Sequence, residues 1–190
     1  MRASSTEQTW WPSRPRPWSD RVDLPEHVKI REVGPRDGFQ NEPEVIATAD
    51  KIALIDCLTA TGLERLEVTS FVRPDVIPQL ADGAEVLRGV QRREGVSFSV
   101  LIPNRRGLEN ALPLRDRFDE ISVFLSASQT HNQKNVNRTI EQSLDELADV
   151  VADARAADLR CVAVIATSFG CPYEGRVDPC SVFSIAERLA

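Results

Sequence analysis

The chain has 190 residues and a net charge of −6 at pH 7, with 42% hydrophobic and 27% charged residues. These values are typical of a soluble globular protein whose length fits a single domain with a substantial core. No apolar run approaches the about 20 residues that a membrane helix needs, and the interspersed charges argue against a nucleic-acid-binding surface.

The first 24 residues differ in composition from the rest of the chain. They are rich in proline, arginine and tryptophan and contain no apolar segment of the kind that forms a secretory signal peptide. The repeated prolines also prevent a regular helix. We therefore expect a poorly ordered tail over residues 1–24, one domain over residues 25–190, and a cytoplasmic protein with no membrane or nucleic-acid partner.

From Val28 onward, short apolar runs alternate with segments of helical periodicity. Five strands are predicted, at residues 28–33, 65–69, 97–102, 120–125 and 160–166. The first helix between them has Thr48 as its predicted N-cap and Gly62 as its stop signal. The clearest helix begins at a predicted capping box that pairs Thr139 with Gln142. Another helix is predicted over residues 82–91, and a weaker helical pattern covers residues 104–112.

Alternation of strands and helices predicts an α/β fold with a parallel sheet. A Rossmann fold is disfavoured because no Gly-x-Gly-x-x-Gly motif follows a strand, and a P-loop is also absent from the sequence. A (β/α) barrel of TIM type fits better, although a complete barrel takes eight strands and about 250 residues. The sequence therefore predicts a barrel truncated to about five βα units.

The turn after the first strand carries an adjacent cation and anion. Arg36 and Asp37 lie between Gly34-Pro35 and Gly38, residues that favour a sharp turn of fixed geometry. The carboxyl ends of strands are where parallel α/β folds place their active sites. A solvated ion pair on a surface turn is the alternative interpretation.

Glu67 is the acidic residue within the second strand. Side chains alternate along a strand, so Leu66 and Val68 share one face and Glu67 lies on the other. If the apolar pair faces the helices, Glu67 points toward the barrel axis and needs a cation, because an unpaired buried carboxylate is costly. Arg36 is an available cation, and an ordinary salt bridge to another basic residue is the alternative.

Two further segments follow strand ends. Residues 126–138 form a strongly polar segment that we interpret as a loop, and its Lys134 and Arg138 suit a phosphorylated or carboxylate-bearing ligand. His131 in this segment is expected to be a hydrogen-bonding residue rather than a metal ligand. Residues 170–175, with two glycines and a proline, predict a shaped turn.

Three of these strand-end motifs together resemble the hydroxymethylglutaryl-CoA lyase family, metal-dependent lyases and synthases built on TIM barrels. The motifs are Val33–Glu42, Glu67–Val72 and Gly170–Gly175, and the resemblance runs from about Val28 to Ala190 without large gaps. It implies a pyruvate carboxyltransferase-like barrel domain. The implied reaction is cleavage of a 3-hydroxy-3-methylglutaryl-CoA-like thioester, an acyl-CoA substrate, to acetoacetate and acetyl-CoA.

The resemblance also implies roles for four residues. Arg36 would bind the acyl oxygen of the substrate and offset the negative charge of the enolate as the carbon–carbon bond breaks. Asp37 would be a ligand of a divalent metal, Mg²⁺ or Mn²⁺. Glu67 would orient the substrate or assist proton transfer, and Gln40 would line the same substrate site.

Further parts of the family's site lie on later strands. They are a His-x-His metal pair, an asparagine ligand and a catalytic cysteine. Cys171 does not correspond to that cysteine, because it matches the family's turn after the fifth strand. No His-x-His occurs in the 190 residues, so we expect the chain by itself to be inactive or nearly so. Two alternatives remain open. One is a non-catalytic partial barrel that forms a homo-oligomer or pairs with a complementing C-terminal fragment, and the other is a related isopropylmalate- or homocitrate-type synthase.

Overall fold

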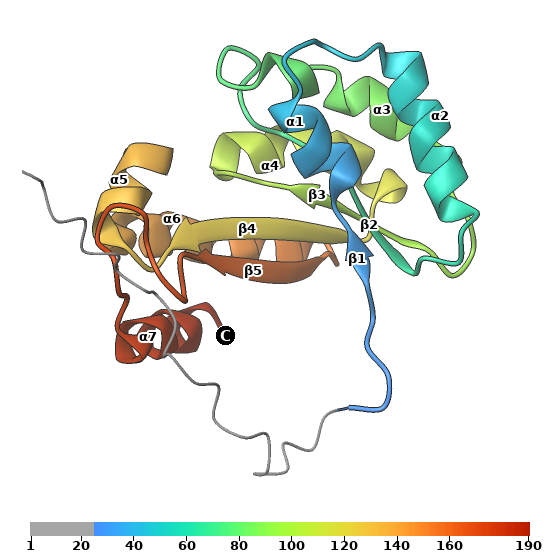
Figure 1. The fold of residues 1–190 in the computed structure, drawn as a ribbon. Helices are drawn as coiled ribbons and strands as arrows, with labels where there is room; N and C mark the ends of the chain where they lie inside the picture. The colour runs from blue at the N-terminus through green and yellow to red at the C-terminus, as the bar shows by residue number, and fades with distance from the viewer. Residues whose placement is uncertain (1–24) are drawn as a thin grey trace, which may run out of the picture.

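The computed structural model describes residues 25–190, so the tail predicted over residues 1–24 lies outside the described residues. Five parallel strands form one curved sheet in the order β1-β2-β3-β4-β5, the arrangement of a half-barrel (Figure 1). Each strand therefore pairs with its neighbour in the sequence. The strands are β1 (Arg31–Glu32), β2 (Arg65–Ser70), β3 (Ser97–Leu101), β4 (Glu120–Ser126) and β5 (Arg160–Ala166).

Seven α-helices within residues 25–190 connect or follow the strands. Helix α3 packs against β2, α6 packs against both β4 and β5, and α7 packs against β5. No helix of this part of the chain is long and apolar enough to cross a membrane. The helices are α1 (Phe39–Asn41), α2 (Thr48–Thr59), α3 (Gly83–Gly89), α4 (Arg105–Ala111), α5 (Gln129–Val136), α6 (Ile140–Ala156) and α7 (Pro179–Leu189).

The longest helix begins as the sequence predicts. The Gln142 backbone N–H donates to Thr139 Oγ1 over 3.1 Å, and the Thr139 N–H donates to Gln142 Oε1 over 3.0 Å. This capping box satisfies two backbone donors that would otherwise lack intrahelical partners. The apolar stripe of α6, which includes Leu144 and Leu147, is then buried against the sheet.

The core lies between the sheet and its helices. Leu66 and Val68 are buried on the helix side of β2, and the strand's alternation places Glu67 on the opposite, concave side. Burial of the apolar side chains is the main favourable contribution to this packing. The larger buried side chains of this core include Ile55, Leu87, Phe98, Ile102, Leu108, Ile121 and Leu125.

Three predicted elements differ from the structure. Strand β1 spans two residues instead of six. Ala47 is the N-cap of α2, and the Thr48 hydroxyl, predicted as the cap, donates to Asp82 Oδ2 over 2.7 Å. The polar segment interpreted as a loop contains helix α5, because Ser128 Oγ accepts from the His131 N–H and caps the helix.

Asp119 aligns the beginnings of β3 and β4. Its carboxylate accepts from both terminal nitrogens of Arg92, at 2.6 and 2.9 Å, and from the Phe98 N–H at 2.8 Å. Burial acts to raise the pKa of Asp119, but these hydrogen bonds and the positive charges of Arg92 and Arg160 outweigh it and lower the pKa from 3.8. The ionised carboxylate therefore stabilises the fold.

Asp119→Asn is expected to lower the free energy of unfolding at pH 7 by about 1 kcal/mol, because the variant loses charge-assisted hydrogen bonds at a partly exposed site. The folded-state pKa lies below the unfolded one, so this contribution is present above pH 3.8 and is lost as the pH falls through the lower folded-state value. Urea unfolding at several pH values measures the difference between wild type and variant. A difference that stayed constant or grew on acidification would contradict this assignment.

Candidate functional site

The turn after β1 places Arg36 and Asp37 at the carboxyl ends of the strands. Residues Gly34–Gly38 form a π-helical turn in which the Asp37 N–H donates to the Val33 carbonyl over 2.7 Å. The Gly34 N–H donates to Glu32 Oε1 over 2.6 Å, and a Cβ at Gly34 would lie 2.9 Å from that oxygen. A side chain at this position would require the Glu32 carboxylate to move away from the Gly34 N–H.

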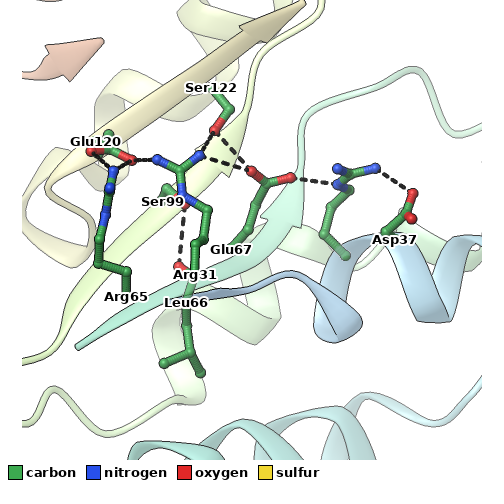
Figure 2. Close-up of polar contacts among 9 residues, drawn as sticks. Arg31, Asp37, Arg65, Leu66, Glu67, Ser99, Glu120 and Ser122 are labelled. Atoms are coloured by element: carbon green, nitrogen blue, oxygen red, sulfur yellow. Dashed lines mark hydrogen bonds and ion pairs between the residues drawn. The ribbon is translucent and has the colours of Figure 1, made fainter. Parts of the chain in front are cut away.

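Arg36 bridges two carboxylates. Its Nε donates to Glu67 Oε1 over 2.5 Å, and its Nη1 donates to Asp37 Oδ1 over 2.7 Å (Figure 2). The Glu67 side chain is 2% exposed, whereas the Asp37 side chain is 53% exposed. The guanidinium thus connects the interior of the half-barrel to its open end. The structure places Glu67 toward the barrel axis, where the strand pattern predicts it.

A second set of charges lies deeper on the concave face of the sheet. Arg31 of β1 contacts Glu67 of β2 and donates to both Glu120 and Ser122 of β4 (Figure 2). Arg65 donates to both oxygens of Glu120, at 2.6 and 2.8 Å. These residues belong to no motif that predicts a site, although charged side chains within strands are a signal of a polar interior.

A cavity of about 650 Å³ opens beside the Arg36 turn. Its lining includes all four predicted site residues, Arg36, Asp37, Gln40 and Glu67, and it also includes Lys134 and Arg138. The rest of the lining is mixed. Its polar members are Arg73, Asn104, Asn135 and Asn137, and its apolar members are Val72, Val76, Ile77, Leu101, Pro103, Phe124, Val136, Val164 and Ala166. A volume of this size, lined by apolar side chains together with polar and charged groups, is typical of a small-molecule site.

Two other residues considered from the sequence lie outside the cavity lining. His131 Nδ1 lies 2.6 Å from Ser126 Oγ, and the ring lies near that of Tyr173. Cys171 is buried, with its Sγ 3.0 Å from Ser128 Oγ. Burial acts to raise the pKa of the Cys171 thiol, but hydrogen bonds from Ser128 and nearby backbone N–H groups outweigh it and lower the pKa.

A divalent metal would need more ligands than this face provides. Within residues 25–190, no three histidine, cysteine, aspartate or glutamate side chains lie close enough together to hold a metal ion. Asp37 can offer one carboxylate oxygen, the kind of ligand that Mg²⁺ prefers. Glu67, the other acid of the cavity lining, already accepts from Arg36 and Ser122. The described residues therefore do not form a complete metal site.

A parallel half-barrel with a charged cavity at its carboxyl end defines the class of (β/α)-barrel enzymes. The HMGL-like family model matches residues 27–190. The chain therefore belongs to the HMGL-like family.

Curated relatives and solved structures of this family include hydroxymethylglutaryl-CoA lyases, which are carbon–carbon lyases. The Bacillus subtilis hydroxymethylglutaryl-CoA lyase YngG is 50% identical over 168 residues, which are 88% of this chain and 56% of the relative. A Pseudomonas aeruginosa 3-hydroxy-3-isohexenylglutaryl-CoA/hydroxymethylglutaryl-CoA lyase is 44% identical, over 88% of this chain and 55% of the relative. The chain thus spans about half the length of the curated relatives it matches.

The solved structures confirm the half-barrel. The structure of the Bacillus subtilis HMG-CoA lyase superposes with a TM-score of 0.84 at 50% identity, over 87% of this chain and 55% of the other. An Acinetobacter HMG-CoA lyase solved with coenzyme A and 3-methylmalate gives a TM-score of 0.80 at 39% identity, over 85% of this chain and 52% of the other. The predicted fold class is therefore confirmed.

Proposed function

We propose that this chain provides the substrate-binding half of a hydroxymethylglutaryl-CoA lyase site. The observation that supports the proposal is Arg36, which Glu67 and Asp37 hold at the edge of a cavity at the carboxyl ends of the strands. The family match and the lyase names of the relatives agree with this chemistry. The substrate would be a 3-hydroxy-3-methylglutaryl-CoA-like thioester.

The proposed reaction is a retro-aldol cleavage. The tertiary hydroxyl loses its proton, the bond between C2 and C3 breaks, and the electron pair moves into the thioester as an enolate. Protonation of the enolate gives acetyl-CoA, and the other product is acetoacetate. Arg36 would donate hydrogen bonds to the thioester oxygen, where negative charge develops, and Gln40 would contact the substrate from the same wall.

Lys134 and Arg138 are further cations in the cavity lining. Arg138 is 3.0 Å from Glu146 Oε2, and Lys134 Nζ lies 5.0 Å from the centre of the Tyr173 ring. These cations suit the carboxylate or phosphate groups of an acyl-CoA. We infer that Asp37 is one ligand of a Mg²⁺ or Mn²⁺ ion, which would polarise the substrate oxygens when bound. Its remaining ligands would come from polypeptide beyond the described sheet.

The open edge of β5 indicates where that polypeptide would join. Along β5 the side chains are half-buried or exposed, and Val164, which lines the cavity, is 44% exposed. Within the described residues, β5 pairs with β4 and with no further strand. An unpaired strand edge readily accepts another strand. The rest of a barrel, from the same or another chain, would cover this edge and complete the cavity.

A comparison of two proteins tests the proposed function. The first is the 190-residue chain, and the second is a chimera in which residues 1–190 are joined to the remaining C-terminal part of the Bacillus subtilis relative. With Mg²⁺ and 3-hydroxy-3-methylglutaryl-CoA, we expect acetoacetate release by the chimera and none above background by the isolated chain. Rapid turnover by the isolated chain would contradict the need for further strands. A folded but inactive chimera would contradict the lyase function.

A further inference from the structure

The two carboxylate oxygens of Glu67 have different partners. Oε1 accepts from Arg36 Nε over 2.5 Å, on the side of the cavity. Oε2 accepts from Ser122 Oγ over 2.8 Å and lies 3.6 Å from Arg31 Nη1, so that Ser122 and Arg31 meet the same oxygen (Figure 2). The orientation of this carboxylate therefore decides whether one of its oxygens lies within hydrogen-bond distance of Arg36 Nε.

Arg31 crosses the concave face of the half-barrel. It lies on β1, yet its guanidinium reaches β4, where Nη1 donates to Ser122 Oγ over 3.0 Å and Nη2 donates to Glu120 Oε1. Arg65 anchors the other end of this contact through its two hydrogen bonds to Glu120. The side chain of Arg31 is 17% exposed and Arg31 does not belong to the cavity lining. It is therefore held in place without contacting a ligand in the cavity.

The hydroxyl of Ser122 has a direction that Arg31 sets. A guanidinium has donors and no acceptor, so Ser122 must accept the hydrogen bond from Arg31. The single hydroxyl hydrogen of Ser122 is then free to point at Glu67 Oε2, which as a carboxylate can act as an acceptor. Hydrogen bonds in such a chain strengthen one another. Arg31 thus acts on Glu67 both through Ser122 and through its own charge.

The charges of this group balance. Three guanidinium groups and three carboxylates alternate across the concave face, so that each buried carboxylate meets at least one cation. Removal of Arg31, the cation that contacts both Glu67 and Glu120, would leave these two nearly fully buried carboxylates with one charge partner fewer each. In order along the face, the six are Arg65, Glu120, Arg31, Glu67, Arg36 and Asp37.

We propose that Arg31 is a positioning residue of the candidate site, which acts through Ser122 and Glu67 to fix the guanidinium of Arg36. Arg31 keeps Glu67 Oε2 directed toward β4, so that Oε1 is the acceptor of the hydrogen bond from Arg36 Nε. The Arg36 Nη1 group then stays beside Asp37 at the cavity. The relevance of this role to catalysis rests on the proposed function, whereas the positioning itself does not.

The experiment measures the Arg36 Nε–H group directly. In the uniformly ¹⁵N-labelled chain, its resonance is assigned by its loss in Arg36→Lys, and its exchange rate with water is followed by NMR. We expect Arg31→Met to speed this exchange about tenfold, the effect of weakening one charged hydrogen bond. Ser122→Ala should speed it as well, because it removes the hydroxyl that holds Oε2. Arg31→Lys, which retains the charge, should restore part of the protection.

Arg105→Met is the matched control, because Arg105 is an exposed arginine on α4 whose ion pairs join it to α6. It should leave the Arg36 signal unchanged. Unchanged or slower exchange in folded Arg31→Met would show that Glu67 holds Arg36 without Arg31 and would overturn the proposal. If Arg31→Met does not fold, the Ser122→Ala variant provides the test. Unchanged exchange of the Arg36 Nε–H in Ser122→Ala would overturn the proposal. Because the readout needs no turnover, an inactive chimera would count against the proposed function and leave this result standing.

Discussion

Glu67→Gln is expected to lower the free energy of unfolding by about 3 kcal/mol, which would make it one of the most damaging single substitutions in the half-barrel. The glutamine keeps the size of the side chain but has one acceptor oxygen and one donor group. If its oxygen faces Arg36, its amide hydrogens face Ser122, whose own hydroxyl hydrogen then loses its acceptor. If it is flipped, its amide meets the Arg36 donor instead.

The loss of charge adds to this mismatch. Arg36 and Arg31 are mostly buried, so neither can regain full hydration when its carboxylate partner becomes neutral. Urea unfolding followed by circular dichroism measures the effect at neutral pH. Glu64→Gln is the matched control, because Glu64 pairs with Lys29 on the surface and both side chains are largely exposed. Equal stabilities for the two variants would show that the buried charge group contributes nothing to the fold.

The alternation of strands and helices predicts the parallel sheet, and the absence of a Gly-x-Gly-x-x-Gly motif after any strand favours the barrel over a Rossmann fold. Strand β5 spans the predicted residues, and the capping box of α6 forms as expected, because local hydrogen bonds and apolar periodicity determine both features. Helix α5 was missed since its sequence has no apolar stripe. It is stabilised by contacts that join separate segments, above all by Asn132, whose side-chain amide donates to two backbone carbonyls and to Ser143 Oγ.

The sequence predicts those features of the candidate site that depend on the pattern within one strand or the turn that follows it. Alternation along β2 predicts that Glu67 faces inward, and the glycines and proline around Arg36 predict a turn at the strand end. The partners of Arg31 follow from the curvature of the sheet, which brings β1 and β4 together across the concave face. No pattern within one strand carries that information. Arg31, Ser122 and Glu120 were therefore identified from the structure.

The contact between Glu67 and Arg36 leads to a prediction about catalysis. Arg36→Lys in the chimera is expected to reduce kcat for acetoacetate release by roughly 10²–10³-fold, the cost of losing one preorganised donor at a developing oxyanion. Lysine keeps the positive charge but is a point charge on a flexible stem, so it cannot contact Glu67, Asp37 and a substrate oxygen in the fixed geometry of a guanidinium.

The matched control is Arg106→Lys, at an exposed position of α4 outside the cavity lining, which should leave kcat and KM unchanged. For Arg36→Lys, whether the loss of activity lies in kcat or in KM shows whether Arg36 binds the transition state or the substrate. A group that binds charge developing in the transition state affects kcat and kcat/KM together, whereas a group that binds substrate and transition state equally affects KM. A rise in KM with kcat preserved would therefore assign Arg36 to ground-state binding and contradict its proposed role at the enolate. A parallel fall in kcat and kcat/KM, with the chimera still folded, would connect the buried carboxylate network to bond cleavage through Arg36.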